Sequence, residues 1–86
     1  MTYHPMMEQF FIKGTRYYQI TLTRDLLGDW VVTKINGRRG SRLGRIRNTP
    51  VASARDGRVL IEEASRLRIA HGYRLRCAAG AKRPHD

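Results

Sequence analysis

Hydrophobic and polar residues alternate most regularly over residues 16–23, which predicts a strand with one buried side. Tyr18, Ile20 and Leu22 share one side of an extended chain, and mostly polar residues take the other side. Residues 30–35, Trp-Val-Val-Thr-Lys-Ile, are rich in the β-branched and aromatic types that favour strands. Because a turn of about five residues separates the two segments, we expect them to form a hairpin.

A shorter strand is expected over Glu8–Ile12, led by Phe10 and Phe11 and broken by Gly14. We take this segment as an exposed edge strand. Unpaired backbone groups on such an edge can pair with another chain, so self-pairing of two copies through this strand is one expected mode of association.

Two further strands follow the hairpin. Residues 45–49 are expected to form a strand with Ile46 pointing inward, ended by Pro50 because proline cannot donate a ladder hydrogen bond. Residues 73–76 can add a brief last strand. With the segments above, these complete an antiparallel sheet.

One long helix is expected between these last strands. Ser53 suits its N-cap, Asp56 lies in its first turn, and the helix runs to about His71, where Gly72 suits the C-cap. The spacing of the hydrophobic positions predicts a buried stripe that comprises Leu60, Ile61, Ala64, Leu67 and Arg68.

The predicted fold class is therefore α+β, with an antiparallel sheet of about four strands and one long helix packed on a face. The domain is expected over residues 10–76. Residues 1–9 are expected to be an irregular segment and residues 77–86 a flexible tail.

The net charge of the chain indicates what kind of partner it binds. The 86 residues include 17 Lys and Arg, 14 of them Arg, against 7 Asp and Glu, for a net charge of +10. Such a balance on one small domain indicates a polyanionic partner, with nucleic acid ahead of an anionic membrane surface, and it excludes a multidomain enzyme. No membrane partner is expected, since the longest runs without a charged residue are seven long.

The sequence gives little support for a catalytic function. His71 lies at the predicted helix end, and the other two histidines lie near the chain termini. Cys77, the single cysteine, has no histidine at an informative spacing, and the adjacent Glu62 and Glu63 point about 100° apart on a helix. No enzyme activity, metal or cofactor is therefore expected, and the lone cysteine fits a cytoplasmic protein.

A glycine-rich loop over residues 36–44 is the clearest candidate for chemistry. Its glycines allow backbone N–H groups to approach an anion, and its arginines supply planar forks that match phosphate. From Lys34 to Arg47 the chain carries no acidic residue and six basic ones: Lys34, Arg38, Arg39, Arg42, Arg45 and Arg47. The alternative is a solvated hairpin tip whose arginines only aid solubility.

The aromatic residues divide between core and surface. Tyr18 is expected in the core because it shares a side with Ile20 and Leu22. Tyr17 lies on the other side, where it is either a surface residue or a stacking platform. Trp30 is either at the edge of the core or a stacking residue.

The order of motifs resembles the WGR domain family. The motifs are Tyr17–Leu22, then Leu27–Val32, then Asn36–Gly40, then a helix that closes on Gly72 and Tyr73. Gly37 and Arg38 match the Trp-Gly-Arg triplet that names the family, and Asn36 stands where the family has Trp.

The resemblance implies a sheet-plus-helix domain that contacts DNA at strand breaks, as in DNA-damage-responsive poly(ADP-ribose) polymerases. It implicates Arg38 and the loop at Gly40, and it matches Arg68 to the family's basic residue near the helix C-terminus. It implies no transferase activity, because the catalytic region of those polymerases has no counterpart here.

These observations predict a nucleic-acid-binding module, for DNA ahead of RNA, with Arg-rich phosphate contacts, little sequence readout and strand breaks as one possible target. The alternative is a protein-interaction module that binds an acidic partner or recruits one to DNA. The predicted nucleic-acid-binding residues are Lys34, Asn36, Gly37, Arg38, Arg39, Gly40, Arg42, Arg45, Arg47 and Arg68.

Overall fold

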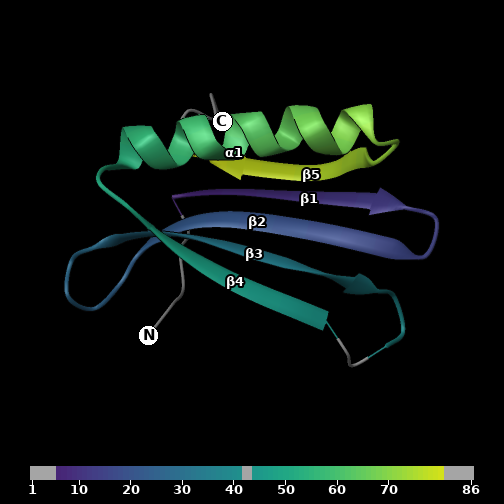
Figure 1. The fold of residues 1–86 in the computed structure, drawn as a ribbon, viewed down its shortest axis with the longest axis horizontal. Coiled ribbons are helices and arrows are strands. Elements are labelled where there is room, and N and C mark those ends of the chain that lie inside the picture. The colour runs from purple at the N-terminus through teal and green to yellow at the C-terminus, as the bar shows by residue number, and fades with distance from the viewer. Residues whose placement is uncertain (1–5, 42–43, 81–86) are drawn as a thin grey trace.

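The computed structural model describes residues 6–41 and 44–80 of the chain, and they form an antiparallel sheet with one helix on it (Figure 1). The five strands stand in the order β4-β3-β2-β1-β5. In chain order the elements are β1 (Met7–Lys13), β2 (Arg16–Arg24), β3 (Trp30–Arg38), β4 (Gly44–Val51), α1 (Ala54–Ala70) and β5 (Arg74–Gly80). The α+β class is confirmed, with one strand more than predicted.

The predicted hairpin of β2 and β3 is the centre of the sheet. Leu22 pairs with Val32 and Ile20 with Lys34, so each strand presents the same side to the helix. A tight turn at Gly14, whose φ of +59° favours glycine, joins β1 to β2. The local turns therefore produce three consecutive hairpins, and only β5 reaches its neighbour through a helix.

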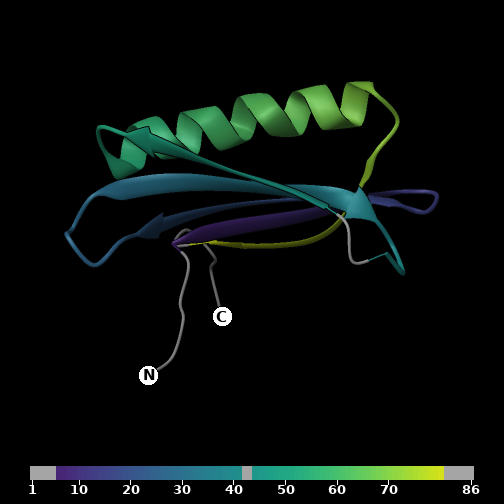
Figure 2. The same cartoon turned by 60° about the horizontal axis from the view of Figure 1, so that its bottom comes forward.

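The core lies between the sheet and α1, which covers one face and leaves the other face uncovered (Figure 2). Its fully buried large side chains come from both layers: Phe11, Ile20, Leu22, Val32 and Ile61. Tyr18 is also buried, and Trp30 packs against this cluster from its edge, as predicted for both.

Gly57 sets how closely α1 approaches the sheet. A Cβ atom at this position would lie 2.4 Å from the Leu22 Cδ1 atom, a separation that real side chains do not show. Gly57 is buried together with Ile61 and Ala64, which follow on the same line of the helix. The glycine that weakens the isolated helix therefore permits the tertiary contact.

The N-cap of the helix is the predicted Ser53, and the C-cap lies one residue before the predicted Gly72. The Asp56 N–H donates to the Ser53 hydroxyl oxygen at 3.1 Å, and Ser53 has extended backbone angles. At the other end His71 is the cap residue and Gly72 adopts a φ of +92°. The Lys13 ammonium group also donates to the His71 carbonyl oxygen at 2.6 Å.

Replacing Ser53 with alanine is expected to lower the free energy of unfolding by about 1 kcal/mol, because the Asp56 N–H loses its acceptor. Thermal unfolding monitored by circular dichroism measures the change. Ser53→Asp supplies a carboxylate acceptor and is expected to retain the stability of the original chain, so a loss of equal size in both variants would contradict the capping role.

Several predicted strand ends are wrong. Asn36, Gly37 and Arg38 belong to β3, where the sequence favoured a loop, because pairing with β2 outweighs the local turn preference of Asn-Gly. Pro50 does not end β4, which continues to Val51. Proline is tolerated there because β4 is an edge strand, so its missing N–H costs no ladder bond.

The predicted edge strand and domain limits also need correction. Residues 8–12 lie in β1, between β2 and β5, so self-pairing through an open edge of this strand is excluded. Met7–Gln9 are in β1, where an irregular segment was predicted, and Cys77–Gly80 are in β5, where a tail was predicted. Met6 is described and donates its backbone N–H to the Leu22 carbonyl oxygen, while residues 1–5 and 81–86 lie outside the described residues.

Two hydrophobic residues point away from the core, contrary to prediction. Ile46 is 69% exposed, because β4 pairs with β3 in the register that turns Arg45 and Arg47 to the helix side. Leu67 is 55% exposed, because it lies roughly 90° around the helix from the line of Gly57, Ile61 and Ala64.

Candidate nucleic-acid interface

Cationic side chains gather on the helix side of β2, β3 and β4. Residues directly opposite in a sheet share a face, so the register assigns every second residue of these strands to the helix side. Tyr18 and Ile20 mark that side because both are buried beneath α1. We call its polar part around the end of β3 the basic face, which consists of Arg16, Lys34, Asn36, Arg38, Arg45 and Arg47; Arg24 and Thr49 lie on the same side nearer the other end of the strands.

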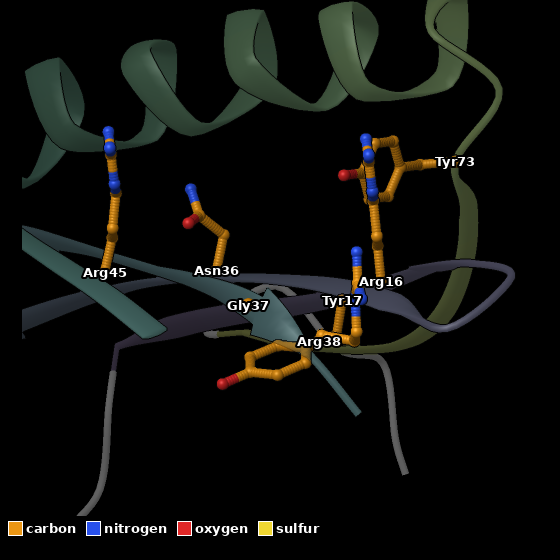
Figure 3. A pocket seen from close by; sticks show the side chains of 7 residues that line it. All are labelled: Arg16, Tyr17, Asn36, Gly37, Arg38, Arg45 and Tyr73. Atoms are coloured by element: carbon orange, nitrogen blue, oxygen red, sulfur yellow. The ribbon is translucent and has the colours of Figure 1, made fainter. Parts of the chain in front are cut away.

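Part of the basic face borders an open hollow of about 750 Å³ at the end of β3. Its lining residues are Arg16, Tyr17, Asn36, Gly37, Arg38, Arg45 and Tyr73. Figure 3 shows Arg16, Arg38 and Arg45 rising from three different strands toward the side of the helix. Gly37 lies in β3 between them, and its backbone forms part of the lining.

Like charges face one another across the strands of the basic face. Arg16 stands opposite Arg38, and Lys34 stands opposite Arg47. All helix-facing positions of β2, β3 and β4 are described, and none carries a carboxylate. Facing like charges destabilise a sheet, so an anion that neutralises them would gain binding energy from the relief of this repulsion.

An aromatic cluster holds Arg68 next to the hollow. The Arg68 guanidinium carbon lies 4.7 Å from the Tyr18 ring centre and 5.4 Å from that of Tyr73. Burial raises the pKa of the Tyr18 phenol above its usual value, and the nearby Arg68 charge partly opposes this rise. Arg68 therefore supports Tyr73, a wall of the hollow, rather than lining the hollow itself.

The predicted site residues fall into three groups. Asn36, Gly37, Arg38 and Arg45 line the hollow, so the structure brings this part of the prediction together. Lys34 and Arg47 lie on the same face, one row further along the strands. The remaining predicted residues do not line the hollow or lie outside the described residues: Arg39 and Gly40 in the turn after β3, Arg68 on α1, and the undescribed Arg42.

Three residues of the hollow were not predicted as site residues, namely Arg16, Tyr17 and Tyr73. Arg16 carried a usable signal, because the alternation that buries Tyr18 also places Arg16 on the same side of β2. Its position opposite Arg38 depends on cross-strand register, which the alternation within one strand does not contain.

Tyr17 points away from the helix, as the alternation predicted (Figure 3). Its ring stacks on Phe10 with the ring centres 6.0 Å apart and an interplanar angle of 24°. The Arg24 guanidinium carbon lies 5.0 Å from the Trp30 ring centre, at the edge of the core. A role of Tyr17 or of Trp30 in base stacking stays a prediction.

No group of three or more His, Cys, Asp or Glu side chains within the described ranges is placed to hold a metal ion. Among the same residues, no helix has the length and apolar character needed to cross a bilayer. Cys77 lies exposed on β5.

Comparisons of this chain with protein-family models, with curated proteins and with solved structures find no match.

Proposed function

We propose that this chain is a nucleic-acid-binding module that holds the phosphate backbone, DNA ahead of RNA, on the basic face. The observation that carries the proposal is the convergence of Arg16, Arg38 and Arg45 from three strands on one hollow without a carboxylate on the same face. Guanidinium groups bind phosphate oxygens through paired hydrogen bonds, and a concave site concentrates their field.

The proposed contact reads charge and shape rather than base sequence. Specific recognition of duplex DNA commonly inserts a helix or a β-ribbon into the major groove. Here α1 packs on the sheet through Gly57, Ile61 and Ala64, and the arginines of the hollow point toward the same layer. Phosphate contacts from this face would position the protein on nucleic acid with little dependence on sequence.

A relationship to the WGR domain family, with contact at strand breaks, is part of this proposal. It rests on the ordered motifs, chiefly Gly37 and Arg38 of the triplet. Arg38 lines the hollow, which supports its proposed role in phosphate contact. Asn36 also lines the hollow, and a carboxamide there can donate to phosphate but cannot stack as an indole does.

An acidic protein is the alternative partner for the same face. Carboxylates also accept paired hydrogen bonds from arginine, so the basic face by itself permits both ligands. The density of charge separates them, because duplex DNA carries one charge per about 1.7 Å of its axis, and few acidic proteins match this spacing.

Binding of a labelled DNA duplex is expected to weaken with salt, with a slope of log K against log salt of about −4.5. The value follows from about five phosphate contacts, one for each cation of the basic face, at roughly 0.9 released ions per contact. Fluorescence anisotropy across a salt series measures the slope. A slope near zero would contradict phosphate-driven binding.

Competition distinguishes the two partner classes. Unlabelled duplex is expected to displace the labelled duplex at a lower concentration of charge than polyglutamate of matched total charge. Equal displacement by polyglutamate would favour the acidic protein partner. Intact circles and nicked circles, compared in the same assay, test the preference for strand breaks.

A further inference from the structure

A smaller concave site lies at the end of the sheet where the turn between β1 and β2 meets the start of β5 (Figure 1). We call it the turn pocket. Its volume is about 240 Å³, and its lining residues are Ile12, Lys13, Gly14, Gly72, Arg74 and Arg76. Residues 9–24 and 64–78, the segments that build the turn pocket, contain no acidic residue. Three cations therefore gather there without a carboxylate from the same segments to neutralise them.

The Lys13 side chain is held in place in the turn pocket. Its ammonium group donates to the His71 carbonyl oxygen at 2.6 Å, and its charge offsets the partial negative charge at the C-terminus of α1. A Cβ atom at Gly72 would lie 3.3 Å from the Lys13 Cε atom, so the glycine leaves room for this side chain. Because an ammonium group has three N–H donors, others remain available for an anion.

Two arginines of β5 complete the turn pocket. Arg74 pairs with Ile12, so it lies on the sheet face away from α1. A bulge in β5 opposite Phe10 and Phe11 makes Arg76 an extra residue without a direct partner in β1. Bulges bend a strand and redirect side chains. Both arginines are exposed and line the same pocket, so their guanidinium groups can reach one ligand.

The turn pocket continues a row of cations that begins in the hollow. Tyr73 lines the hollow, and the Lys13 ammonium group lies 5.8 Å from the centre of its ring. Lys13 also pairs with Arg16, which in turn pairs with Arg38. One cation from each of the five strands stands at this end of the sheet, in the spatial order Arg45, Arg38, Arg16, Lys13 and Arg74.

We propose that the turn pocket is a second phosphate site, and that it holds a single-stranded nucleic acid whose backbone passes from the hollow round the end of the sheet. The proposal rests on the proposed function of the basic face. Arg16 and Arg38 lie on the helix side of the sheet, whereas Arg74 lies on the other side. One ligand can reach both sides only if it bends.

The stiffness of the ligand decides between one strand and two. The persistence length of duplex DNA is about 150 base pairs, so a duplex that lies against the helix side stays straight over the length of this domain. A single strand is flexible, and proteins that bind single strands commonly follow the backbone with a line of cations. The change of face between Arg16 and Arg74 therefore favours a single strand.

Replacing both Arg74 and Arg76 with alanine tests the second site. The probes are a labelled thymidine oligonucleotide of about 15 residues and a labelled duplex of the same length. The variant is expected to bind the single strand about 20-fold more weakly, and the duplex only about two- to fivefold more weakly through the loss of net charge. Its salt slope on the single strand should become shallower by about 1.4, for two lost contacts. Fluorescence anisotropy measures these quantities.

The Arg55→Ala and Arg66→Ala double variant is the matched control. Both arginines are exposed on α1 and line neither the hollow nor the turn pocket. It removes the same two charges and is expected to weaken both probes about two- to fivefold. An equal loss on the single strand in the two double variants would overturn the second site. Equal losses on the two probes after replacement of Arg74 and Arg76 would overturn the single-stranded path.

A variant of the hollow separates this inference from the proposed function. Replacing Arg38 and Arg45 with alanine is expected to weaken both probes, because each probe contacts the hollow. If this variant binds weakly while replacement of Arg74 and Arg76 has no effect beyond the control, the proposed function stands and the second site falls. If it binds both probes as the original chain does, the proposed function falls, and the path from the hollow falls with it. Circular dichroism checks that every variant is folded.

Discussion

Replacing both Arg38 and Arg45 with alanine is expected to weaken the binding of DNA by roughly 30- to 100-fold. Each arginine that binds a phosphate contributes about 1–1.5 kcal/mol, and about 1.4 kcal/mol corresponds to a factor of ten. The salt slope is expected to become shallower by about 2, since two phosphate contacts are lost. Anisotropy titrations at several salt concentrations measure both quantities.

The same variant is expected to fold as well as the original chain. Arg38 and Arg45 are both exposed, and Arg38 stands opposite Arg16, so its removal relieves a repulsion between like charges. The thermal midpoint should therefore stay within about 5 °C of its original value. An unchanged midpoint with weakened binding assigns these arginines to the ligand rather than to the core.

A second pair of arginines provides the control for net charge. Arg55 and Arg66 are exposed on α1 and belong to neither the hollow nor the basic face. Replacing both with alanine removes the same two charges and is expected to weaken binding only about two- to fivefold, through the general field of the protein. Equal losses in the two double variants would mean that DNA responds to net charge and not to the hollow.

Replacing Gly57 with alanine is expected to lower the free energy of unfolding by about 2 kcal/mol. Helix propensity alone predicts the opposite, a gain of about 1 kcal/mol, because alanine restricts the unfolded chain and favours helix. The added Cβ atom would lie 2.4 Å from the Leu22 Cδ1 atom, so either the fully buried Leu22 side chain or α1 must shift. Overpacking of this kind commonly costs about 1–3 kcal/mol.

A double-mutant cycle with Leu22→Ala separates these two effects. Leu22→Ala removes the atoms that the new Cβ would meet and by itself costs about 3 kcal/mol through the loss of buried surface. In that background, Gly57→Ala is expected to be neutral or stabilising, which gives an interaction energy of about 2 kcal/mol between the positions. Chemical denaturation of the four proteins measures the cycle, and strict additivity would contradict a direct steric contact.

The local signals in the sequence were sufficient for most elements of the fold. The alternation around Tyr18 and Ile20 defines β2 because a half-buried strand requires a period of two. Ser53 and Gly72 define the ends of α1 because each satisfies backbone groups or angles at its own position. These features depend on neighbours within a few residues, so a single chain segment contains the information.

Local conformational preferences gave wrong predictions where pairing with a distant strand outweighed them. Asn36 and Gly37 favour a turn, yet both lie in β3 because β2 on one side and β4 on the other provide ladder partners. The segment after α1 is short and weakly patterned, and it extends to Gly80 as β5 because β1 offers an open edge. The pairing of β5 with β1 joins segments that are far apart in the sequence, so no pattern within a few residues predicts it.

The sequence by itself determined that a small α+β domain carries a dense run of cations, with no acid between Lys34 and Arg47. Only the tertiary structure decided which of them converge. The register of β4 on β3 turns Arg45 and Arg47 toward the helix and Ile46 away from it, and a shift by one residue would reverse all three. Alternation establishes that neighbouring residues face opposite ways, but the face that each takes is set by hydrogen bonds to another strand.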